Sequence, residues 1–193
     1  MAKFTDTLTE AHQKFIQNQK LFFTGTAALE ADSRINISPK GLDSFSVISE
    51  KEVAYMDLIG SGNETSAHTL QNSRITIMFC SFDKVPNILR IYGKGRAVIP
   101  ASPDWEGYAS HFELAPNTRQ IMVIDVESVQ TSCGYGVPVY EYKGGRDQFD
   151  KWTQHKGEEG MKAYILEKNM KSIDGLETDW ARHAAEKGEQ ITS

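Results

Sequence analysis

Cysteine is scarce in this sequence: the 193 residues include only two, Cys80 and Cys133. Two cysteines are too few for a disulfide framework or a four-thiolate zinc site, and neither stands in a Cys-x-x-Cys pair. We interpret both as buried free thiols in a reducing compartment. The histidines are scattered without the spacing of metal ligands, so the sequence predicts no metal site.

Long apolar runs and clusters of basic residues are missing as well. The first residues lack the apolar stretch of a secretory signal, and no segment is apolar for long enough to cross a bilayer. The net charge of -5 argues against nucleic-acid binding, which needs clustered Lys and Arg. We therefore expect a cytoplasmic protein with no nucleic-acid and no membrane partner.

Motifs for hydrolysis are also missing. The sequence has no Gly-x-Ser-x-Gly elbow and no paired-carboxylate motif, so hydrolytic chemistry has no support. The hydrophobic fraction of 39% and the charged fraction of 24% are those of a globular chain. Its length is sufficient to bury a substantial core, which favours one domain.

The sequence does contain a succession of short β-rich runs. β-Branched and aromatic residues gather in the runs 21–29, 34–38, 44–48, 53–58, 74–82, 87–99 and 119–132. Gly93 and Gly95 interrupt one of these runs and predict a bulge or bend. The run from Ile75 to Cys80 is apolar on both faces, as in a barrel wall whose outside is covered, for example by a partner subunit.

Helical periodicity precedes, separates and follows these runs. The spacing predicts an opening helix over 5–19 capped by Thr5 or Asp6, a helix over 63–72 capped by Asn63, and a short helix opening at 102–104. After residue 142 the pattern is helical, with a joint at Gly157. We therefore expect a mainly β (α+β) unit over 1–142 and a C-terminal helical extension of the same domain over 143–193.

A glycine-rich loop between a predicted strand and a predicted helix is the first candidate binding segment. It comprises Gly60, Ser61, Gly62, Asn63, Glu64 and Thr65. Free backbone amides and the positive end of a helix dipole attract a phosphate. The loop matches neither the dinucleotide fingerprint nor the P-loop. An ordinary Asn-capped helix, with Glu64 satisfying its dipole, is the alternative interpretation.

Two further segments carry polar groups that suit an anionic ligand. In one of them a strand ends in a Pro-fixed turn, which comprises Asn36, Ser38, Pro39, Lys40 and Gly41. There Lys40 either pairs with a ligand phosphate or is a solvated turn residue. In the other, Arg90 and Tyr92 share a strand face opposite Leu89 and Ile91, so Arg90 points into a cavity or makes a rim salt bridge.

A third segment, 131–138, is a glycine-rich exit from a long strand and holds Cys133 and Tyr135. Loops on a rigid scaffold often line binding sites. Nothing nearby in the sequence indicates a depressed thiol pKa, so a nucleophilic role for Cys133 is the minority interpretation.

The order of these segments, from about residue 20 to 138, resembles the pyridoxamine 5′-phosphate oxidase-like flavin-binding family. The resemblance is carried by Arg34-Ile35-Asn36-Ile37-Ser38-Pro39-Lys40, Ala54-Tyr55-Met56-Asp57, the run from Gln71 to Phe79, and Ile88-Leu89-Arg90-Ile91-Tyr92-Gly93. The segments 38–41, 60–65 and 130–138 are more closely similar to a bacterial branch known only as oxidase-related.

The resemblance implies a six-stranded antiparallel split β-barrel that forms a homodimer and binds flavin mononucleotide (FMN) at the dimer interface. Residues 36–41 would follow the flavin ring and ribityl chain, Asp57 and residues 60–65 would bracket the phosphate, and Arg90 would come from the neighbouring strand. Cys133 and Tyr135 would belong to a roof over the substrate cleft. The chemistry implied is that of an oxidoreductase acting with a small-molecule substrate or electron donor.

Several residues depart from the family pattern. Glu64 and Thr65 stand where the true oxidases have an Arg-Lys pair, and Ile88 stands where they have Gln. The acidic stretch 174–193 replaces their basic, Pro-ending segment. These departures argue against pyridoxamine phosphate oxidation itself. A non-catalytic module that stores or senses flavin, haem or another planar ligand is the alternative function.

Overall fold

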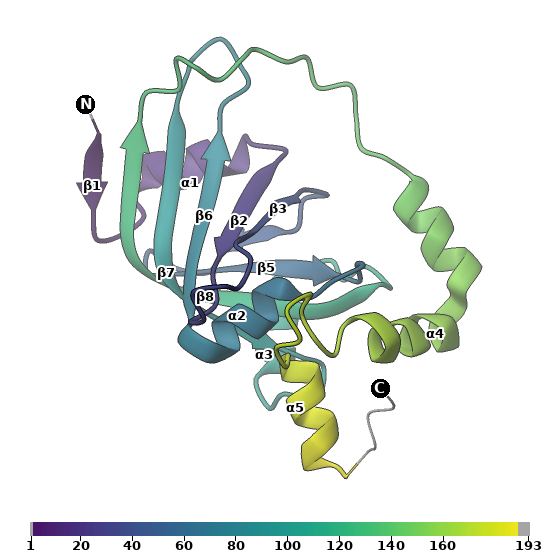
Figure 1. Cartoon of the computed structure of the whole chain (residues 1–193). Helices are drawn as coiled ribbons and strands as arrows, with labels where there is room; N and C mark the ends of the chain where they lie inside the picture. Colours follow the sequence, from purple (N-terminus) through teal and green to yellow (C-terminus); the bar gives the residue numbers. More distant parts are fainter. Residues whose placement is uncertain (1, 189–193) are drawn as a thin grey trace.

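The computed structural model describes residues 2–188, in which eight β-strands form one antiparallel sheet. Their bounds are β1 (Lys3–Thr5), β2 (Phe22–Thr26), β3 (Asn36–Lys40), β4 (Phe45–Val47), β5 (Glu52–Leu58), β6 (Arg74–Cys80), β7 (Ile88–Val98) and β8 (Thr118–Ser132). The hydrogen-bonded order is β3-β2-β6-β7-β8-β5-β4, and β1 pairs with β8. Because the first half of β8 pairs with β5 and its end pairs with β1, the sheet curls into a half-barrel (Figure 1).

This curled sheet confirms the predicted split β-barrel of the mainly β class. Among the described residues, β2, β3, β5, β6, β7 and β8 have five residues or more, and β1 and β4 have three. The two short strands lie beside longer ones, β1 on β8 and β4 on β5. The six longer strands thus correspond to the predicted barrel.

The inner face of the sheet holds the main hydrophobic core. The ring centroid of Phe22 lies 5.1 Å from that of Phe45 and 5.5 Å from those of Tyr55 and Phe79. Buried aliphatic side chains surround these rings, namely Val53, Ile75, Ile77, Leu89, Ile91, Met122, Ile124 and Val129. Because side chains alternate along a strand, Arg90 of β7 projects from the outer face.

Helices pack against the sheet. Within residues 2–188 they are α1 (Glu10–Gln17), α2 (Glu64–Asn72), α3 (Trp105–Ala109), α4 (Gln148–Lys168) and α5 (Asp179–Glu186). α3 covers Ala54, Ile121 and Val123 on the face opposite the main core. Residues 2–188 contain no helix that combines the length and the hydropathy of a membrane span.

The predicted cap of the opening helix at Thr5 or Asp6 is wrong. Thr5 belongs to β1, and α1 begins only at Glu10, with Thr9 as its N-cap. The Thr9 hydroxyl accepts a hydrogen bond from the His12 amide at 3.3 Å. The segment before Thr9 is extended because it pairs with the distant end of β8, which local spacing cannot indicate.

The predicted turn at Pro39 is also wrong. β3 runs through Pro39, which lies opposite Phe23 of β2, and ends at Lys40. Proline is tolerated in this strand because β3 is at one end of the sheet order, where the missing N–H can face the free edge. The chain reverses later, where Leu42 and Asp43 adopt positive φ angles of 61° and 50°. Lys40 is thus presented by a strand.

The C-terminal extension follows a stretch without regular structure over 133–147 (Figure 1). The predicted joint is confirmed, because Gly157 breaks α4 with a φ of 64°. After the joint, Met161 and Ile165 are buried in a cluster with Ile59, which follows β5. The extension therefore packs onto the chain segment that precedes α2.

Gly93 lies at the predicted bulge, where the β7–β8 register shifts between Tyr92 and Gly93. A Cβ atom there would lie 2.1 Å from the carbonyl oxygen of Asp125. We expect Gly93→Ala to lower the free energy of unfolding by about 2 kcal/mol or more, because backbone must move to relieve the overlap. Chemical denaturation measures this. Gly107→Ala is the control, since its Cβ would meet nothing within 4 Å, and an equal loss in both variants would contradict the prediction.

Candidate functional site

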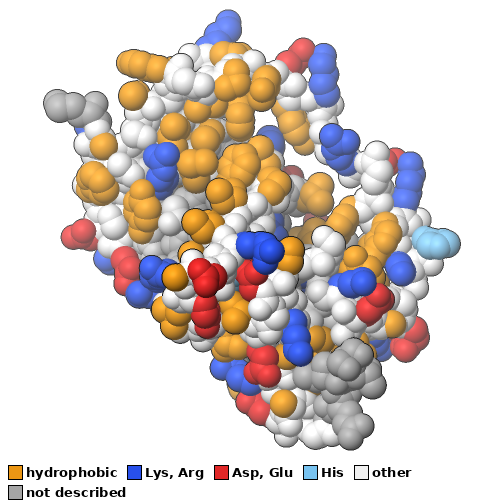
Figure 2. All heavy atoms as spheres, in the orientation of Figure 1, with side chains coloured by type: hydrophobic (Ala, Val, Ile, Leu, Met, Phe, Trp, Pro, Cys, Tyr) orange, Lys and Arg blue, Asp and Glu red, His pale blue; other side chains and the backbone are white. Residues whose placement is uncertain are grey.

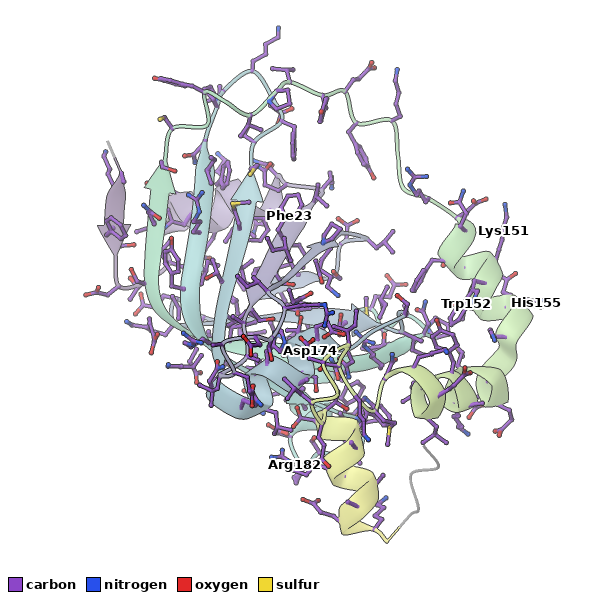
Figure 3. The ribbon with its side chains drawn as sticks, in the orientation of Figure 1. Phe23, Lys151, Trp152, His155, Asp174 and Arg182 are labelled. Carbon is purple, nitrogen blue, oxygen red and sulfur yellow. The ribbon has the colours of Figure 1, made fainter. Side chains whose placement is uncertain are left out.

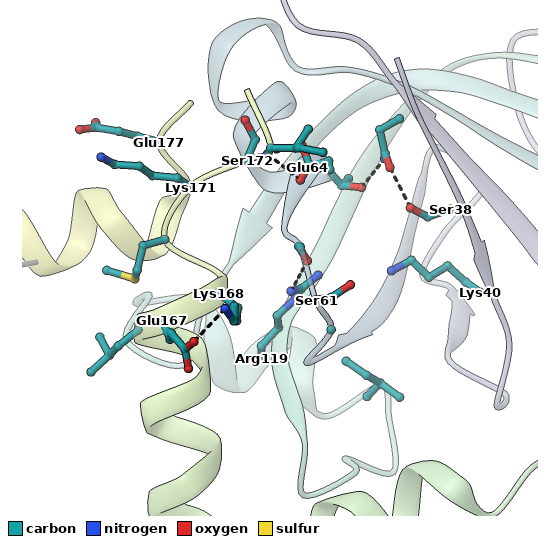
Figure 4. A pocket seen from close by; sticks show the side chains of 18 of the residues that line it. Ser38, Lys40, Ser61, Glu64, Arg119, Glu167, Lys168, Lys171, Ser172 and Glu177 are labelled. Carbon is teal, nitrogen blue, oxygen red and sulfur yellow. Dashed lines mark hydrogen bonds and ion pairs between the residues drawn. The ribbon is translucent and has the colours of Figure 1, made fainter. Parts of the chain in front are cut away.

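A cleft of about 1000 Å³ opens between β3, the glycine-rich loop before α2, and the segment that joins α4 to α5 (Figure 4). The barrel contributes one wall and the C-terminal extension the other. The barrel wall is lined by Asn36, Ser38, Pro39, Lys40, Leu58, Gly60, Ser61, Gly62, Glu64, Thr65 and Arg119. The extension wall is lined by Leu166, Glu167, Lys168, Met170, Lys171, Ser172, Ile173 and Glu177.

A completely buried carboxylate, Asp57 of β5, lies behind the barrel wall. Its Oδ1 is 2.5 Å from the Lys40 ammonium, and its Oδ2 is 2.9 Å from Nη2 of Arg119. Gln120 Nε2 donates to the same Oδ2 at 2.8 Å. A buried charge is tolerated only when it is paired and hydrogen-bonded, and Asp57 meets both conditions.

These partners determine the protonation of Asp57. Burial by itself raises the pKa of this carboxyl, but the adjacent cations of Arg119 and Lys40 outweigh it and lower the pKa from 3.8 to about 2. Asp57 is therefore ionised at neutral pH. Within this cluster the two cations and one carboxylate leave one net positive charge, and Glu64 adds a separate negative charge to the same wall.

The same cluster holds the glycine-rich loop in place. Arg119 Nη1 donates to the Gly62 carbonyl oxygen at 2.7 Å, and Gln120 Nε2 donates to Oδ1 of the buried Asn63 at 2.8 Å. Asn63 occupies the N-cap position of α2 but makes no side-chain cap hydrogen bond. Its side chain is used to fix the loop, so the amides of the first α2 turn are not capped by it.

The inner-facing side chains of β3 form a second polar network. Asn36 Nδ2 donates to the Thr65 hydroxyl at 3.1 Å and to the Thr26 hydroxyl at 3.2 Å. The Ser38 hydroxyl donates to Asn36 Oδ1 at 2.9 Å. β3 is therefore joined to the first turn of α2, which sets the width of the cleft on this side.

The extension wall is anchored to the loop and to α2. Asn169 Nδ2 donates to the Gly60 carbonyl oxygen at 2.8 Å, and the Ile173 amide donates to both carboxylate oxygens of Glu64 at 3.0 and 3.1 Å. The Ser66 hydroxyl donates to the buried Asp179 of α5 at 3.0 Å. Asp174 accepts from the backbone amide of Arg34 at 2.7 Å, which ties the extension to the chain just before β3 (Figure 3).

The structure brings most of the predicted site residues to this cleft. Eight of them line it, namely Asn36, Ser38, Pro39, Lys40, Gly60, Ser61, Gly62 and Thr65. Asp57 and Asn63 lie buried directly behind the wall. Gly41 follows β3 and is not among the lining residues.

Three predicted site residues lie elsewhere. Arg90 is on the outer face, where its Nη1 donates to the Ser132 hydroxyl at 3.3 Å. Cys133 is exposed just beyond β8, so its predicted burial is wrong, whereas Cys80 is buried as predicted. Tyr135, two residues after Cys133, is 84% exposed. One copy of the chain therefore does not unite these three residues with the cleft.

Arg119, Gln120 and the lining residues of the extension were not predicted from the sequence. A signal for Arg119 did exist: a carboxylate such as Asp57 inside an apolar strand run requires a buried cation. Choosing Arg119 as that cation requires the β5–β8 pairing, in which Asp57 lies opposite Gln120. Nothing local marks the extension, since its composition is that of an ordinary solvated helix.

The outer face of the sheet is apolar in places. Ile35 and Ile37 are 75% and 70% exposed, and Phe4 is 64% exposed. Hydrophobic side chains gather over this side of the sheet in Figure 2. A shallow depression of about 480 Å³, bordered by Ile37 and Tyr92 among others, lies on it. Apolar patches of this kind often mark protein–protein contacts.

Comparisons with known proteins connect this architecture to one family. The family model described as pyridoxamine 5′-phosphate oxidase matches residues 8–133. The pyridoxamine 5′-phosphate oxidase family protein ustO of Aspergillus flavus is 34% identical over 195 residues, which cover 91% of this chain and 77% of that protein.

Solved structures show the same fold. HupZ of Group A Streptococcus superposes with a TM-score of 0.51 at 20% identity, over 63% of this chain and 91% of that one. A candidate pyridoxamine 5′-phosphate oxidase of Lactobacillus delbrueckii superposes with a TM-score of 0.51 at 14% identity, over 65% of this chain and 94% of that one. Each of these superpositions leaves about a third of this chain uncovered.

The buried carboxylate generates a test of stability. We expect Asp57→Asn to lower the free energy of unfolding by about 3 kcal/mol, because Lys40 and Arg119 lose their shared counter-charge. Urea denaturation at neutral pH measures the difference. Asp43→Asn is the control, since its pair with Lys20 is exposed and changes stability little. Equal effects of the two substitutions would contradict the role assigned to Asp57.

The same carboxylate predicts a pH dependence. Its pKa is lower in the folded chain, so its contribution is complete above about pH 4 and is lost as the pH falls towards 2. We expect the stability gap between the wild type and Asp57→Asn to narrow by about 2 kcal/mol over that interval. Denaturation curves recorded from pH 5 downward follow the gap, and a gap that is constant with pH would refute this assignment.

Proposed function

The chain belongs to the pyridoxamine 5′-phosphate oxidase family, and we propose that it is an FMN-binding flavoprotein of the oxidoreductase type. The observation that carries the proposal is a single cleft that joins the Lys40–Asp57–Arg119 cluster to the glycine-rich loop at the N-terminus of α2. A cationic cluster next to a helix N-terminus attracts a phosphate monoester.

The residues present fit a phosphorylated flavin. The Lys40 side chain keeps 20% of its surface exposed while it pairs with Asp57, so its ammonium group has access to the cleft. Ser38, Ser61 and Thr65 add hydroxyl groups to the lining. The cleft volume is at the upper end of the range for small-molecule sites. These groups suit the phosphate and the polar chain of the ligand, and the strand edge suits its flat ring.

The cofactor would bring the redox chemistry, and the protein would bring placement. Bound FMN supplies hydride or electron transfer. Lys40 and the loop would orient it, and a small-molecule substrate or electron donor would bind beside it. This division of roles needs no general acid or base from the chain.

The proposal includes a homodimer with its contact on the outer face. Support comes from the exposed apolar side chains of Phe4, Ile35 and Ile37 on that face. A face-to-face arrangement would also explain why Arg90 and Tyr135 lie away from the cleft of their own copy. In the dimer each would approach the cleft of the other subunit, as a flavin site at a subunit interface requires.

Flavin binding has a direct test. We expect the purified protein to bind FMN, seen as quenching of flavin fluorescence in a titration, and Lys40→Ala to raise the Kd roughly tenfold. A tenfold rise in Kd is small for the loss of a charge-assisted contact, and we expect no more because the same ammonium group is already paired with Asp57. Lys20→Ala is the matched control, since the one ion pair of Lys20 within residues 2–188 is with the exposed Asp43.

Purified protein that is colourless and does not bind added FMN would refute the proposed function. Reduction of bound FMN by a nicotinamide donor, followed by repeated turnover with an acceptor, would support the enzymatic role. Bound flavin that is never reduced would favour storage or sensing instead.

Dimerisation has a separate test. We expect Ile37→Glu to shift the protein from dimer to monomer in sedimentation velocity, because it places a charge within the apolar outer face. FMN affinity should fall in the same variant. Leu114→Glu, between α3 and β8, should leave the dimer intact. A wild type that is monomeric at every concentration, or an Ile37→Glu variant that stays dimeric, would rule out this interface.

A further inference from the structure

Positive charge reaches the cleft from the extension as well as from the barrel. Lys168 and Lys171 line the extension wall, on the opposite side of the cleft from Lys40 in Figure 4, where the Lys171 side chain runs beside that of Glu177. Both belong to the segment outside the family match, which ends at residue 133. The extension therefore adds charged groups that the matched barrel does not contain.

The charges around the cleft are not equally available. Lys40 and Arg119 share the carboxylate of Asp57. Lys168 contacts the carboxylate of its neighbour Glu167 at 2.8 Å, but both side chains are largely exposed and such pairs are weak. Among the cations that line the cleft, Lys171 alone makes no ion pair within residues 2–188.

Lys171 is also held close to the start of α2. Two residues further on, the Ile173 amide donates to the Glu64 carboxylate, and Glu64 is the first residue of α2. The flanking Asn169 is completely buried and bonded to Gly60, while Ser172 is 8% exposed. The backbone that carries Lys171 is thus fixed on both sides beside the helix end where an anion is favoured.

We propose that Lys171, assisted by Lys168, binds the phosphate of the ligand from the extension wall, so that the extension confers the preference for a phosphorylated flavin over an unphosphorylated one. This inference rests on the proposed function and deepens it. On the barrel wall, Asn36 and Ser38 hold the ring and ribityl portion, and the Lys40–Asp57–Arg119 cluster with the loop before α2 receives the phosphate. The extension wall adds the exposed cations Lys168 and Lys171 at the phosphate. Glu64, on the same rim, opposes the phosphate with its own charge.

The test compares FMN with riboflavin, which lacks only the phosphate, in fluorescence titrations of the full chain. We expect Lys171→Gln to raise the Kd for FMN roughly fivefold and to leave the Kd for riboflavin unchanged, as for a partly exposed charge contact. The double variant Lys168→Gln/Lys171→Gln should raise the Kd for FMN further. Lys162→Gln is the matched control, because Lys162 lies on α4, pairs with Glu158 and Glu159, and does not line the cleft.

A second variant removes a negative charge from the cleft, which should change the FMN affinity in the opposite direction. Glu64→Gln keeps an oxygen that can accept the Ile173 amide but removes the negative charge, so it should tighten FMN binding and leave riboflavin binding unchanged. The preference of the wild type for FMN should also shrink at high salt, and less so in Lys171→Gln. These three results would support the assignment.

Two results would overturn it, and they are distinguishable. In the first, the wild type binds FMN, but Lys171→Gln either binds FMN equally well or loses affinity for FMN and riboflavin to the same degree. The extension then does not contact the phosphate, while the proposed function stands. If the wild type binds neither flavin, the proposed function falls together with this inference.

Discussion

The buried carboxylate of Asp57 is the interaction on which the arrangement of the cleft depends. Removing an ionised carboxylate from water costs several kcal/mol unless cations and donors surround it. Lys40 comes from β3, Arg119 and Gln120 come from β8, and Asp57 itself from β5. Satisfying one charge therefore brings three strands together, and the spare donors of Arg119 and Gln120 then fix the loop before α2.

The sequence predicts those features whose causes are local. Alternation of β-branched residues located the longer strands, and two glycines located the bulge in β7 and the break in α4, because each depends on a few adjacent residues. The start of α1 and the path of Pro39 were misjudged, because they depend on the pairing of β1 with β8 and on the free edge of β3. Arg119 was missed for the same reason, since its partner is reached only through the sheet. The extension wall depends entirely on tertiary packing, which no local pattern indicates.

The sheet separates two groups of candidate residues that the sequence placed in one site. Strand alternation puts Asn36, Ser38 and Lys40 on the inner side and Arg90 on the outer side. A shift of one residue in either strand would reverse this, so the apolar core, by fixing the register, also fixes the separation. A ligand that contacts both groups would have to lie where two sheets meet, which is the arrangement of the proposed dimer.

Pro39 has an effect on how copies of this protein can associate. Strands at the end of a sheet expose unpaired backbone groups and invite other chains to add to them. In the edge strand β3 the proline lacks a backbone N–H, so a strand that paired with this edge would miss one hydrogen bond. Open-ended, fibre-like growth along this edge of the sheet is thereby discouraged.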